Sequence, residues 1–217
     1  MEHSKFTRTY LIVNEVLNAC THGIGLGLSI AGLVILLIKG AHLGSAMHIV
    51  SYALYGTMMI LLFLFSTLFH SLIFTKAKKV FQVFDHASIY LLIAGSYTPY
   101  CLLSIGGWRG WTLFSLIWAL AIGGIVYKSL TLHKQDHVSK VSTVIYVIMG
   151  WLCLFATPQL LHSLGSWGTL LLLFGGLSYT FGAVLYSLKG IRYMHVVWHL
   201  FVMLGAGFMY FSVLFFT

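Results

Sequence analysis

The stretch MHVVWHLFVMLGAGFMYFSVLFF, residues 194–216, is apolar along almost its whole length, and its only titratable nitrogen groups are two histidines. As a helix rising 1.5 Å per residue, it is long enough to span the hydrocarbon core of a bilayer. His195 and His199 are four residues apart, so both imidazoles lie on one helix face and could bind a single metal ion. Because polar rings are costly inside a membrane, we expect this pair to have a function.

The composition of the whole chain indicates the same class of protein. Of 217 residues, 59% are hydrophobic and 7% are charged, and the mean hydropathy is +0.95. Soluble domains carry roughly 25% charged residues, so this class is excluded. The polar first ten residues match no signal peptide. The sequence predicts an all-α integral membrane protein, a seven-transmembrane helical bundle forming a single domain over 1–217, with spans at 18–38, 47–70, 87–105, 111–130, 141–161, 167–188 and 194–216.

Basic residues are distributed unequally between the two ends of the predicted helices. Lys39 and Arg109 fall on one side of the membrane. The other side has ten: Lys5, Arg8, Lys76, Lys78, Lys79, Lys128, Lys134, Lys140, Lys189 and Arg192. The positive-inside rule therefore predicts a cytoplasmic N-terminus and a C-terminus outside. Topology and anionic lipid headgroups explain the net charge of +8, and we expect no nucleic-acid partner.

Several polar side chains are predicted to lie at one depth near the cytoplasmic face. His70 ends the second span, with Ser66 one turn deeper on the same face, and Asp85 comes at the start of the third span. His195 and His199 begin the seventh span on the same side of the membrane. Groups far apart in the sequence therefore converge on one shallow layer of the bundle.

Three imidazoles and a carboxylate suit Zn²⁺, which in catalytic sites commonly takes three protein ligands. We predict His70, His195 and His199 as ligands, with Asp85 either as a further ligand or as the group that holds and deprotonates water. Ser66 could orient a ligand or donate to an oxyanion, or it could simply bond to its own helix backbone. Isolated interfacial histidines and a proton relay through the same residues are the alternatives.

A further polar stripe marks the beginning of the first span. Glu15, Asn18 and His22 are spaced three and four residues apart, which places them on one helix face. They could support the ligands or a substrate entrance, or they could serve in capping and interfacial hydrogen bonding. His86 directly follows Asp85, and its direction on a helix differs by about 100°, so we do not include it in the site.

At these residues the chain resembles the bacterial hemolysin III proteins, which belong with the progestin and adipoQ receptors and, more distantly, the alkaline ceramidases. The resemblance covers essentially the whole chain. Its motifs are Glu15-x-x-Asn18-x-x-x-His22-Gly23, Ser66-x-x-x-His70, Asp85-His86-x-x-Ile89-Tyr90, Ala94-Gly95-Ser96-Tyr97-Thr98-Pro99 and His195-x-x-x-His199.

The resemblance implies zinc bound by His70, His195 and His199, with Asp85 near the metal-bound water and Ser66 beside them. It also implies membership in a superfamily of metal-dependent hydrolases that act on lipid amides. For the bacterial branch, a cytolytic or pore-forming role and a role in membrane homeostasis have both been suggested.

Three functions therefore remain open at the level of sequence. A zinc-dependent hydrolase of lipid amides or esters would take its substrate from the inner leaflet. A cytolytic pore would need a continuous polar path, of which the sixth span and the outer half of the seventh offer little. A sensor would bind lipid, keep zinc structurally and signal through a protein partner that the sequence does not identify. Each function fits a multi-pass protein of a bacterial inner (plasma) membrane, with a membrane lipid as substrate or ligand.

Overall fold

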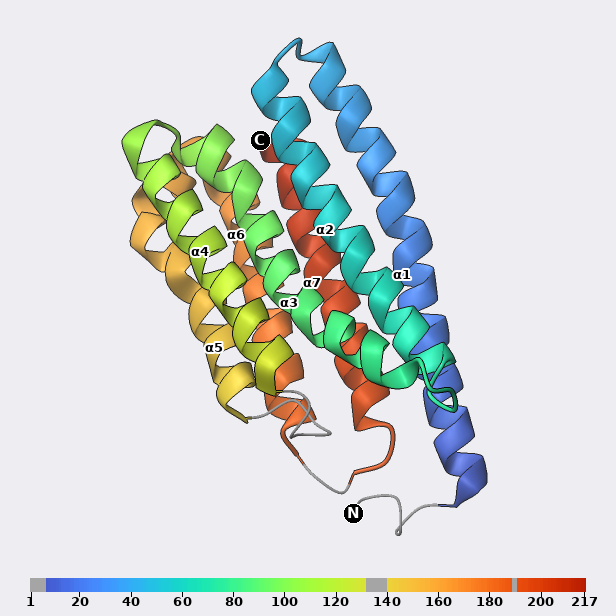
Figure 1. The fold of residues 1–217 in the computed structure, drawn as a ribbon. Coiled ribbons are helices and arrows are strands. Elements are labelled where there is room, and N and C mark those ends of the chain that lie inside the picture. Colours follow the sequence, from blue (N-terminus) through green and yellow to red (C-terminus); the bar gives the residue numbers. More distant parts are fainter. Residues whose placement is uncertain (1–6, 132–139, 189–190) are drawn as a thin grey trace.

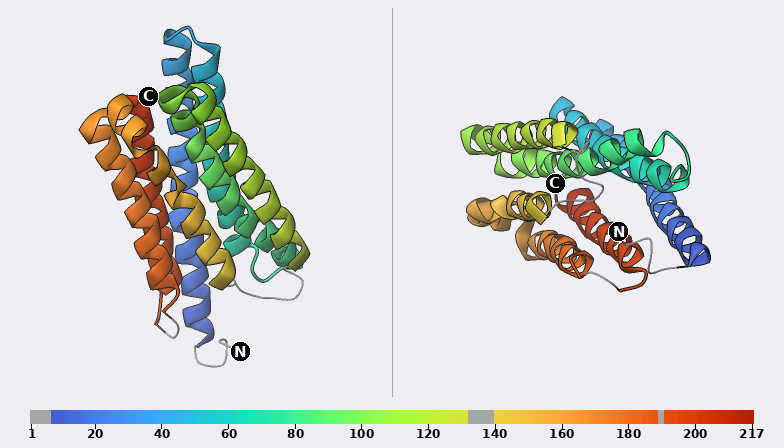
Figure 2. Two further views of the ribbon diagram at one scale, coloured as in Figure 1. Left: turned by 90° about the vertical axis from the view of Figure 1, so that its left-hand side faces the viewer. Right: turned by 60° about the horizontal axis from the view of Figure 1, so that its bottom comes forward.

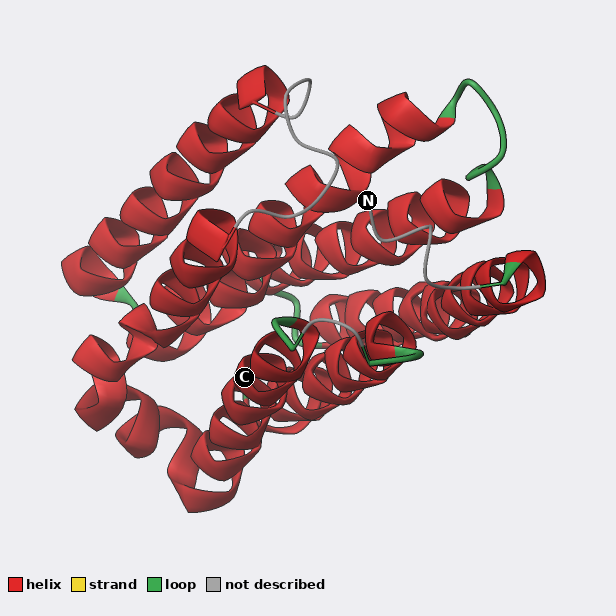
Figure 3. Ribbon diagram, turned by 90° about the horizontal axis from the view of Figure 1, so that it is seen from below, coloured by secondary structure: helices red, strands yellow, loops and turns green. Residues whose placement is uncertain are grey.

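The computed structural model describes residues 7–131, 140–188 and 191–217, and all regular structure in these ranges is helical (Figure 3). In chain order the elements are α1 (Arg8–His42), α2 (Ala46–Ser71), α3 (Lys78–Pro99), the π-helical η1 (Tyr100–Ile105), α4 (Gly107–Thr131), α5 (Lys140–Trp151), the 3₁₀-helical η3 (Leu152–Ala156), α6 (Thr157–Tyr186) and α7 (Met194–Phe216).

The helices run roughly along one direction and form a bundle, with the start of α1 and the end of α7 at opposite ends (Figure 1). Viewed obliquely from below, α2, α3 and α4 gather on one side, and α5, α6 and α7 on the other (Figure 2). The helix α1 packs against both α2 and α7, so it joins the two groups. Side chains of α1 can therefore reach both α2 and α7.

Six helices within the described residues are long and apolar enough to cross a membrane: Arg8–His42, Ala46–Ser71, Lys78–Ile105, Gly107–Leu130, Val141–Tyr186 and Met194–Phe216. Their outward faces carry large apolar side chains, such as Ile24 and Leu28 on α1, which are 61% and 64% exposed. Exposed apolar surface of this extent suits contact with lipid rather than water. The predicted class, a helical membrane protein, is confirmed.

The stretch Val141–Tyr186 has 46 residues, whereas about 20 suffice to span a bilayer. Its helical geometry is broken twice, first by η3 and then at Gly165, whose φ of 64° and ψ of −177° are not helical. The beginning of α5 and the end of α6 lie at the same end of the bundle (Figure 1). The chain therefore turns back on itself within this stretch, close to the connection predicted between 161 and 167.

Two helices begin well before their predicted apolar spans. The helix α1 starts at Arg8 instead of 18, and α3 starts at Lys78 instead of 87. The Thr7 hydroxyl accepts a hydrogen bond from the Tyr10 N–H at 3.3 Å and so caps α1. Hydropathy marks only the lipid-facing length of a helix, whereas backbone hydrogen bonding continues into polar sequence. As a result, Glu15 and Asp85 both lie inside helices.

Close packing fixes α7 against α6. A Cβ added to Gly175 would lie 2.7 Å from the Met209 side chain, and one added to Gly205 would lie 3.1 Å from the Gly175 carbonyl oxygen. The two backbones therefore approach as closely as small residues allow, which is the packing that stabilises helix pairs in membranes. This contact holds the helix that carries His195 and His199.

The described basic residues separate between the two ends of the bundle. The end that holds the start of α1 also has the α2–α3 connection, the last turn of α4 and the segment before α7 (Figure 1). Its described basic residues are Arg8, Lys76, Lys78, Lys79, Lys128, Lys140 and Arg192. Lys5, Lys134 and Lys189 lie outside the described residues. At the opposite end, Lys39 donates to the carbonyl oxygens of Leu214 (2.8 Å) and Thr217 (2.6 Å).

Candidate metal centre

Three histidines from two helices meet near one end of the bundle. His70 lies in the last turn of α2, and His195 and His199 occupy the first two turns of α7. One ring nitrogen from each lies within 4.8 Å of the other two. The ring centroids are 4.9 Å apart for His70 and His195, 5.0 Å for His70 and His199, and 4.7 Å for His195 and His199. The structure thus brings the three predicted ligands together.

The orientation of the His70 ring is set by α1. Its Nδ1 lies 2.7 Å from Oε2 of Glu15, and this carboxylate can only accept a hydrogen bond when ionised. Nδ1 therefore carries the proton, and in the neutral ring Nε2 keeps its lone pair. Nε2 is buried and has no hydrogen-bond partner among the described residues. A buried nitrogen with a free lone pair is suited to binding a metal ion.

The His199 ring is held in the same manner. Its Nδ1 lies 3.2 Å from the backbone carbonyl oxygen of Asn18 and 3.3 Å from Oγ1 of Thr21. Thr21 directs its own hydroxyl at the carbonyl oxygens of Leu17 and Asn18, both at 2.9 Å. Nδ1 is therefore the donor, and Nε2 is the nitrogen available to a ligand. Asn18 supports the site through its backbone, whereas the sequence suggested its side chain.

His22 covers one face of the cluster. Its ring stacks on that of His199, with centroids 3.6 Å apart and planes 8° from parallel, and its edge meets Phe63. The side chain is buried, and neither ring nitrogen has a hydrogen-bond partner among the described residues. His22 lines the same cavity as His195 and His199. It fixes the plane of a candidate ligand ring from the α1 side.

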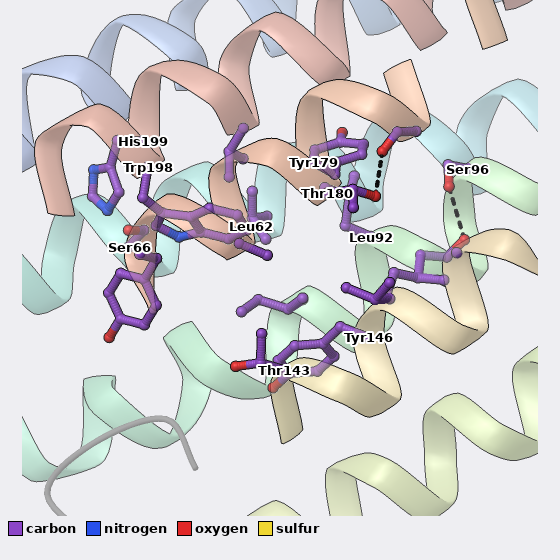
Figure 4. Close-up of a pocket in the computed structure, with 18 of the residues that line it drawn as sticks. Leu62, Ser66, Leu92, Ser96, Thr143, Tyr146, Tyr179, Thr180, Trp198 and His199 are labelled. Carbon is purple, nitrogen blue, oxygen red and sulfur yellow. Dashed lines mark hydrogen bonds between the residues drawn. The ribbon is translucent and has the colours of Figure 1, made fainter. Parts of the chain in front are cut away.

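Asp85 and Ser66 lie beside the histidines. The Asp85 carboxyl is within electrostatic range of the His70 ring. The Ser66 hydroxyl projects from α2 one turn before His70, is buried, and has no hydrogen-bond partner among the described residues. Both residues line the cavity, and Figure 4 shows Ser66 and His199 near the same end of it. Of the predicted site residues, His22, Ser66, Asp85, His195 and His199 line the cavity, whereas His70, Glu15 and Asn18 lie behind this lining and contact each other or the cluster.

The structure adds residues that the sequence reasoning missed. His86 lines the cavity together with Asp85, because this wall accepts side chains from a wide arc of α3. The Tyr186 ring packs edge-on against His195, with centroids 5.3 Å apart. Thr21 has a usable signal, since it is three residues from Asn18 on the same helix face. Tyr186 has none, because its approach depends on how α6 packs against α7.

The polar groups occupy one end of a cavity of about 120 Å³. The cavity extends from them between α3, α5, α6 and α7, and its lining there is largely apolar and aromatic (Figure 4). Its lining includes Leu62, Ile89, Leu92, Trp198 and Val202. An apolar cavity with a few converging polar groups is the usual form of a small-molecule binding site.

The donor set matches the preferences of zinc. Three imidazoles are a common ligand set for this ion, and hydrogen bonds from the other ring nitrogen typically orient such ligands. Here Glu15 supplies that bond for His70, and the Asn18 carbonyl supplies it for His199. The residues present could therefore hold one zinc ion, and Asp85 lines the cavity into which His195 and His199 face.

Comparison with known proteins places the chain in a family. Residues 10–210 match the sequence model of the family described as "Haemolysin-III related". The "Hemolysin-3" of Bacillus cereus is 46% identical over 214 residues, which are 98% of this chain and 96% of that protein. The "Hemolysin-3 homolog" of Bacillus subtilis is 44% identical over 207 residues, 95% of this chain and 96% of the relative.

A more distant similarity extends to mammals. The human "Monocyte to macrophage differentiation factor" is 32% identical over 167 residues, which cover 74% of this chain and 67% of that protein. The resemblance drawn from the sequence motifs is confirmed. The chain belongs to the haemolysin-III related family.

Proposed function

We propose that this protein binds Zn²⁺ through His70, His195 and His199 and hydrolyses an amide or ester bond of a membrane lipid. The observation that carries the proposal is the position of the histidine cluster. It lies at one end of a cavity whose remaining walls are apolar, inside a bundle that suits a bilayer. A polar reaction centre joined to an apolar chamber fits a substrate with a reactive polar group and an aliphatic chain.

The proposed topology has seven crossings, with the N-terminus in the cytoplasm and the C-terminus outside. The reversal of the chain between α5 and α6 supports two crossings within Val141–Tyr186. The separation of the described basic residues supports the orientation through the positive-inside rule. In a bacterial inner membrane, the histidine cluster would then face the inner leaflet, and lipid would reach it from that side.

Zinc bound at this site would act as a Lewis acid that polarises a carbonyl group and makes water easier to deprotonate. Asp85 would accept the proton of the attacking water and later deliver it to the leaving nitrogen or oxygen. The water oxygen forms the new bond to the carbonyl carbon as the bond to the leaving group breaks. The Ser66 hydroxyl, which lines the same cavity as Asp85, would orient the carboxyl group or donate to the developing oxyanion.

Asp85→Asn is the variant that tests hydrolysis. The amide keeps the size of the side chain and removes the base, so zinc binding persists while turnover falls by about 10²–10⁴-fold. The measurement compares the lipids of membranes that contain wild type or Asp85→Asn in equal amount. The proposal is supported if one lipid decreases only in membranes that contain wild type and its fatty acid product increases in the same membranes.

Two outcomes would contradict hydrolysis. Lipid profiles that are identical for both proteins, with specific lipid binding retained, would indicate a sensor. Conductance across liposomes that persists after zinc removal would indicate a pore. The Ser129→Ala variant is a suitable control, because Ser129 is exposed and bonds only to its own helix, at the Ile125 carbonyl oxygen. Its lipid profile should match that of wild type.

A further inference from the structure

A second, smaller cavity of about 20 Å³ borders the cavity that begins at the histidines. The two cavities share four lining residues, Ser96, Tyr97, Gly150 and Met209. We call the boundary formed by these four residues the joint. Met209 follows His199 by ten residues on α7, so the joint lies about 15 Å from the histidines along the helix. The smaller cavity extends beyond it toward Leu160 and Leu172.

The walls on both sides of the joint call for an apolar occupant. Apolar cavities of about 150 Å³ stay dry in proteins and bind apolar guests. A single extended hydrocarbon chain fits a narrow path of this kind. An extended hydrocarbon chain is a zigzag, so each carbon–carbon bond of about 1.5 Å advances it by less than its own length. A chain of about twelve carbons therefore reaches from the histidines to the joint. A longer chain has to pass Gly150 to enter the smaller cavity.

Gly150 differs from the glycines that serve helix packing. A Cβ on Gly95 or Gly182 would lie within 2.7 Å of a neighbouring side chain, so close contact excludes a side chain there. A Cβ on Gly150 would have no atom within 4 Å, and Gly150 does not have a positive φ. Glycine also weakens a helix relative to alanine. Packing and backbone geometry therefore do not require glycine at this position, which lines both cavities.

Tyr97 fixes the shape of the joint. Its hydroxyl donates to the carbonyl oxygens of Met149 (2.9 Å) and Gly150 (2.8 Å) and accepts the N–H of Cys153 at 2.7 Å. These are backbone groups at the end of α5, where it changes into η3. The tyrosine thereby provides hydrogen bonds to the backbone groups at the break in the helix. It also holds Gly150 at the boundary of the two cavities.

We propose that Gly150 determines the chain length of the substrate by keeping the passage between the two cavities open. The occupant is one saturated aliphatic chain, and chains longer than about twelve carbons extend past Gly150 into the smaller cavity. This inference rests on the proposed function, which places the reactive group of the lipid at the histidines. It goes further by naming the residue that sets the length limit.

The test measures how wild type and Gly150→Leu bind saturated fatty acids from octanoate to stearate. Fatty acids are the acid products of the proposed hydrolysis, and equilibrium dialysis of the purified protein in detergent gives their affinities. In wild type, affinity should rise by about fourfold for each added methylene, continuing beyond dodecanoate. In Gly150→Leu the rise should stop at or before dodecanoate, while octanoate binds both proteins equally. Gly150→Ala should lie between them.

Gly123→Leu is the matched control. A Cβ at Gly123 also meets no atom within 4 Å, but this residue is exposed on α4 and lines neither cavity. It should reproduce the wild-type series. Because leucine favours a helix more than glycine does, Gly150→Leu should not unfold at a lower temperature than wild type. An identical length dependence in wild type and Gly150→Leu would overturn the inference, as would a wild-type series that ends at dodecanoate.

The inference and the proposed function fail differently. A protein without zinc or turnover, whose chain-length limit still shifts in Gly150→Leu, would contradict the hydrolase and leave the role of Gly150 standing. Zinc-dependent turnover whose chain-length preference is unchanged in Gly150→Leu would contradict the role of Gly150 alone. The His199→Ala variant separates the two proposals experimentally. It should lose zinc, while its affinity for fatty acids should still rise with chain length as in wild type.

Discussion

The two walls of the cavity are built in opposite ways. On the α1 side, side-chain and backbone groups contact the imidazoles directly, as with Glu15 at His70 and the Asn18 carbonyl at His199. On the α5 side, the helix changes into η3 after Trp151, and hydrogen bonds of Tyr97, Tyr146 and Trp151 hold it to α3 and α6. One wall fixes ring orientation, and the other leaves space for a chain.

This difference has a physical reason. A metal site needs ligand atoms held within fractions of an ångström, so hydrogen bonds behind the rings have a large effect on affinity. An apolar chain needs only surface and volume, so its wall can lack regular helix, provided that the freed backbone groups find partners in the absence of water. Changes on the α1 side should therefore affect metal binding. Changes on the α5 side that remove hydrogen bonds of the backbone or between helices should affect stability and leave metal binding unchanged.

The largest effect is expected on the α1 side, at Glu15. Replacing it by alanine removes the acceptor that fixes the His70 tautomer, and zinc affinity should fall by about 10–100-fold. Glu15→Gln keeps an acceptor oxygen and should lose less. Titration against a competing chelator measures both. The control is Asn18→Ala, because the contact to His199 comes from the backbone carbonyl, which this change retains. Equal affinities for Glu15→Ala and wild type would show that this wall does not position the ligand.

A smaller effect is expected on the α5 side, at Tyr97. Tyr97→Phe removes one hydrogen bond each from the Met149 carbonyl, the Gly150 carbonyl and the Cys153 N–H, and of these the Gly150 carbonyl keeps a contact from the Cys153 thiol. Unsatisfied buried groups of this kind cost about 1–3 kcal/mol. Thermal unfolding in detergent should show the loss, with zinc affinity unchanged. Tyr100→Phe offers a comparison, since its hydroxyl makes one longer bond of 3.3 Å to Met209 and should lose less. A loss of zinc in Tyr97→Phe would contradict the separation of the two walls.

The smallest effect is expected where α5 meets α6. The Trp151 indole donates to Oγ1 of Thr180 at 3.0 Å, and Thr180→Val removes this bond. Polar contacts between membrane helices average about 0.6 kcal/mol, so only a slight decrease in unfolding temperature is expected. Thr169→Val is the matched control on α6, because Thr169 bonds only to the Gly165 carbonyl of its own helix. A larger decrease in the control would show that the contact between α5 and α6 contributes little.

The sequence identified the features that depend on local spacing and on depth in the membrane. The four-residue spacing of His195 and His199 and the span ends at His70 and Asp85 sufficed to bring these residues together. It did not reveal which nitrogen of each ring would be available, because that depends on how α1 packs against α2 and α7. Glu15 reaches His70 only because α1 continues as a helix well before its apolar span.

The distal half of the cavity could not be predicted at all. Gly150 is an ordinary residue of an apolar segment until η3 and the joint with the smaller cavity are known. His86 was set aside by a helical-direction argument that assumes a narrow site, whereas the cavity takes both Asp85 and His86. Such features arise from the meeting of four helices, and no short motif encodes them.

The central claim is that His70, His195 and His199 bind zinc, and metal analysis of detergent-purified protein tests it most directly. Wild type should contain about one zinc per chain, in keeping with a three-histidine site. The His70→Ala, His195→Ala and His199→Ala variants should each lose it. His162→Ala, which changes a histidine outside the cluster, should retain it. Wild-type protein without zinc, or zinc retained in all three cluster variants, would contradict the account.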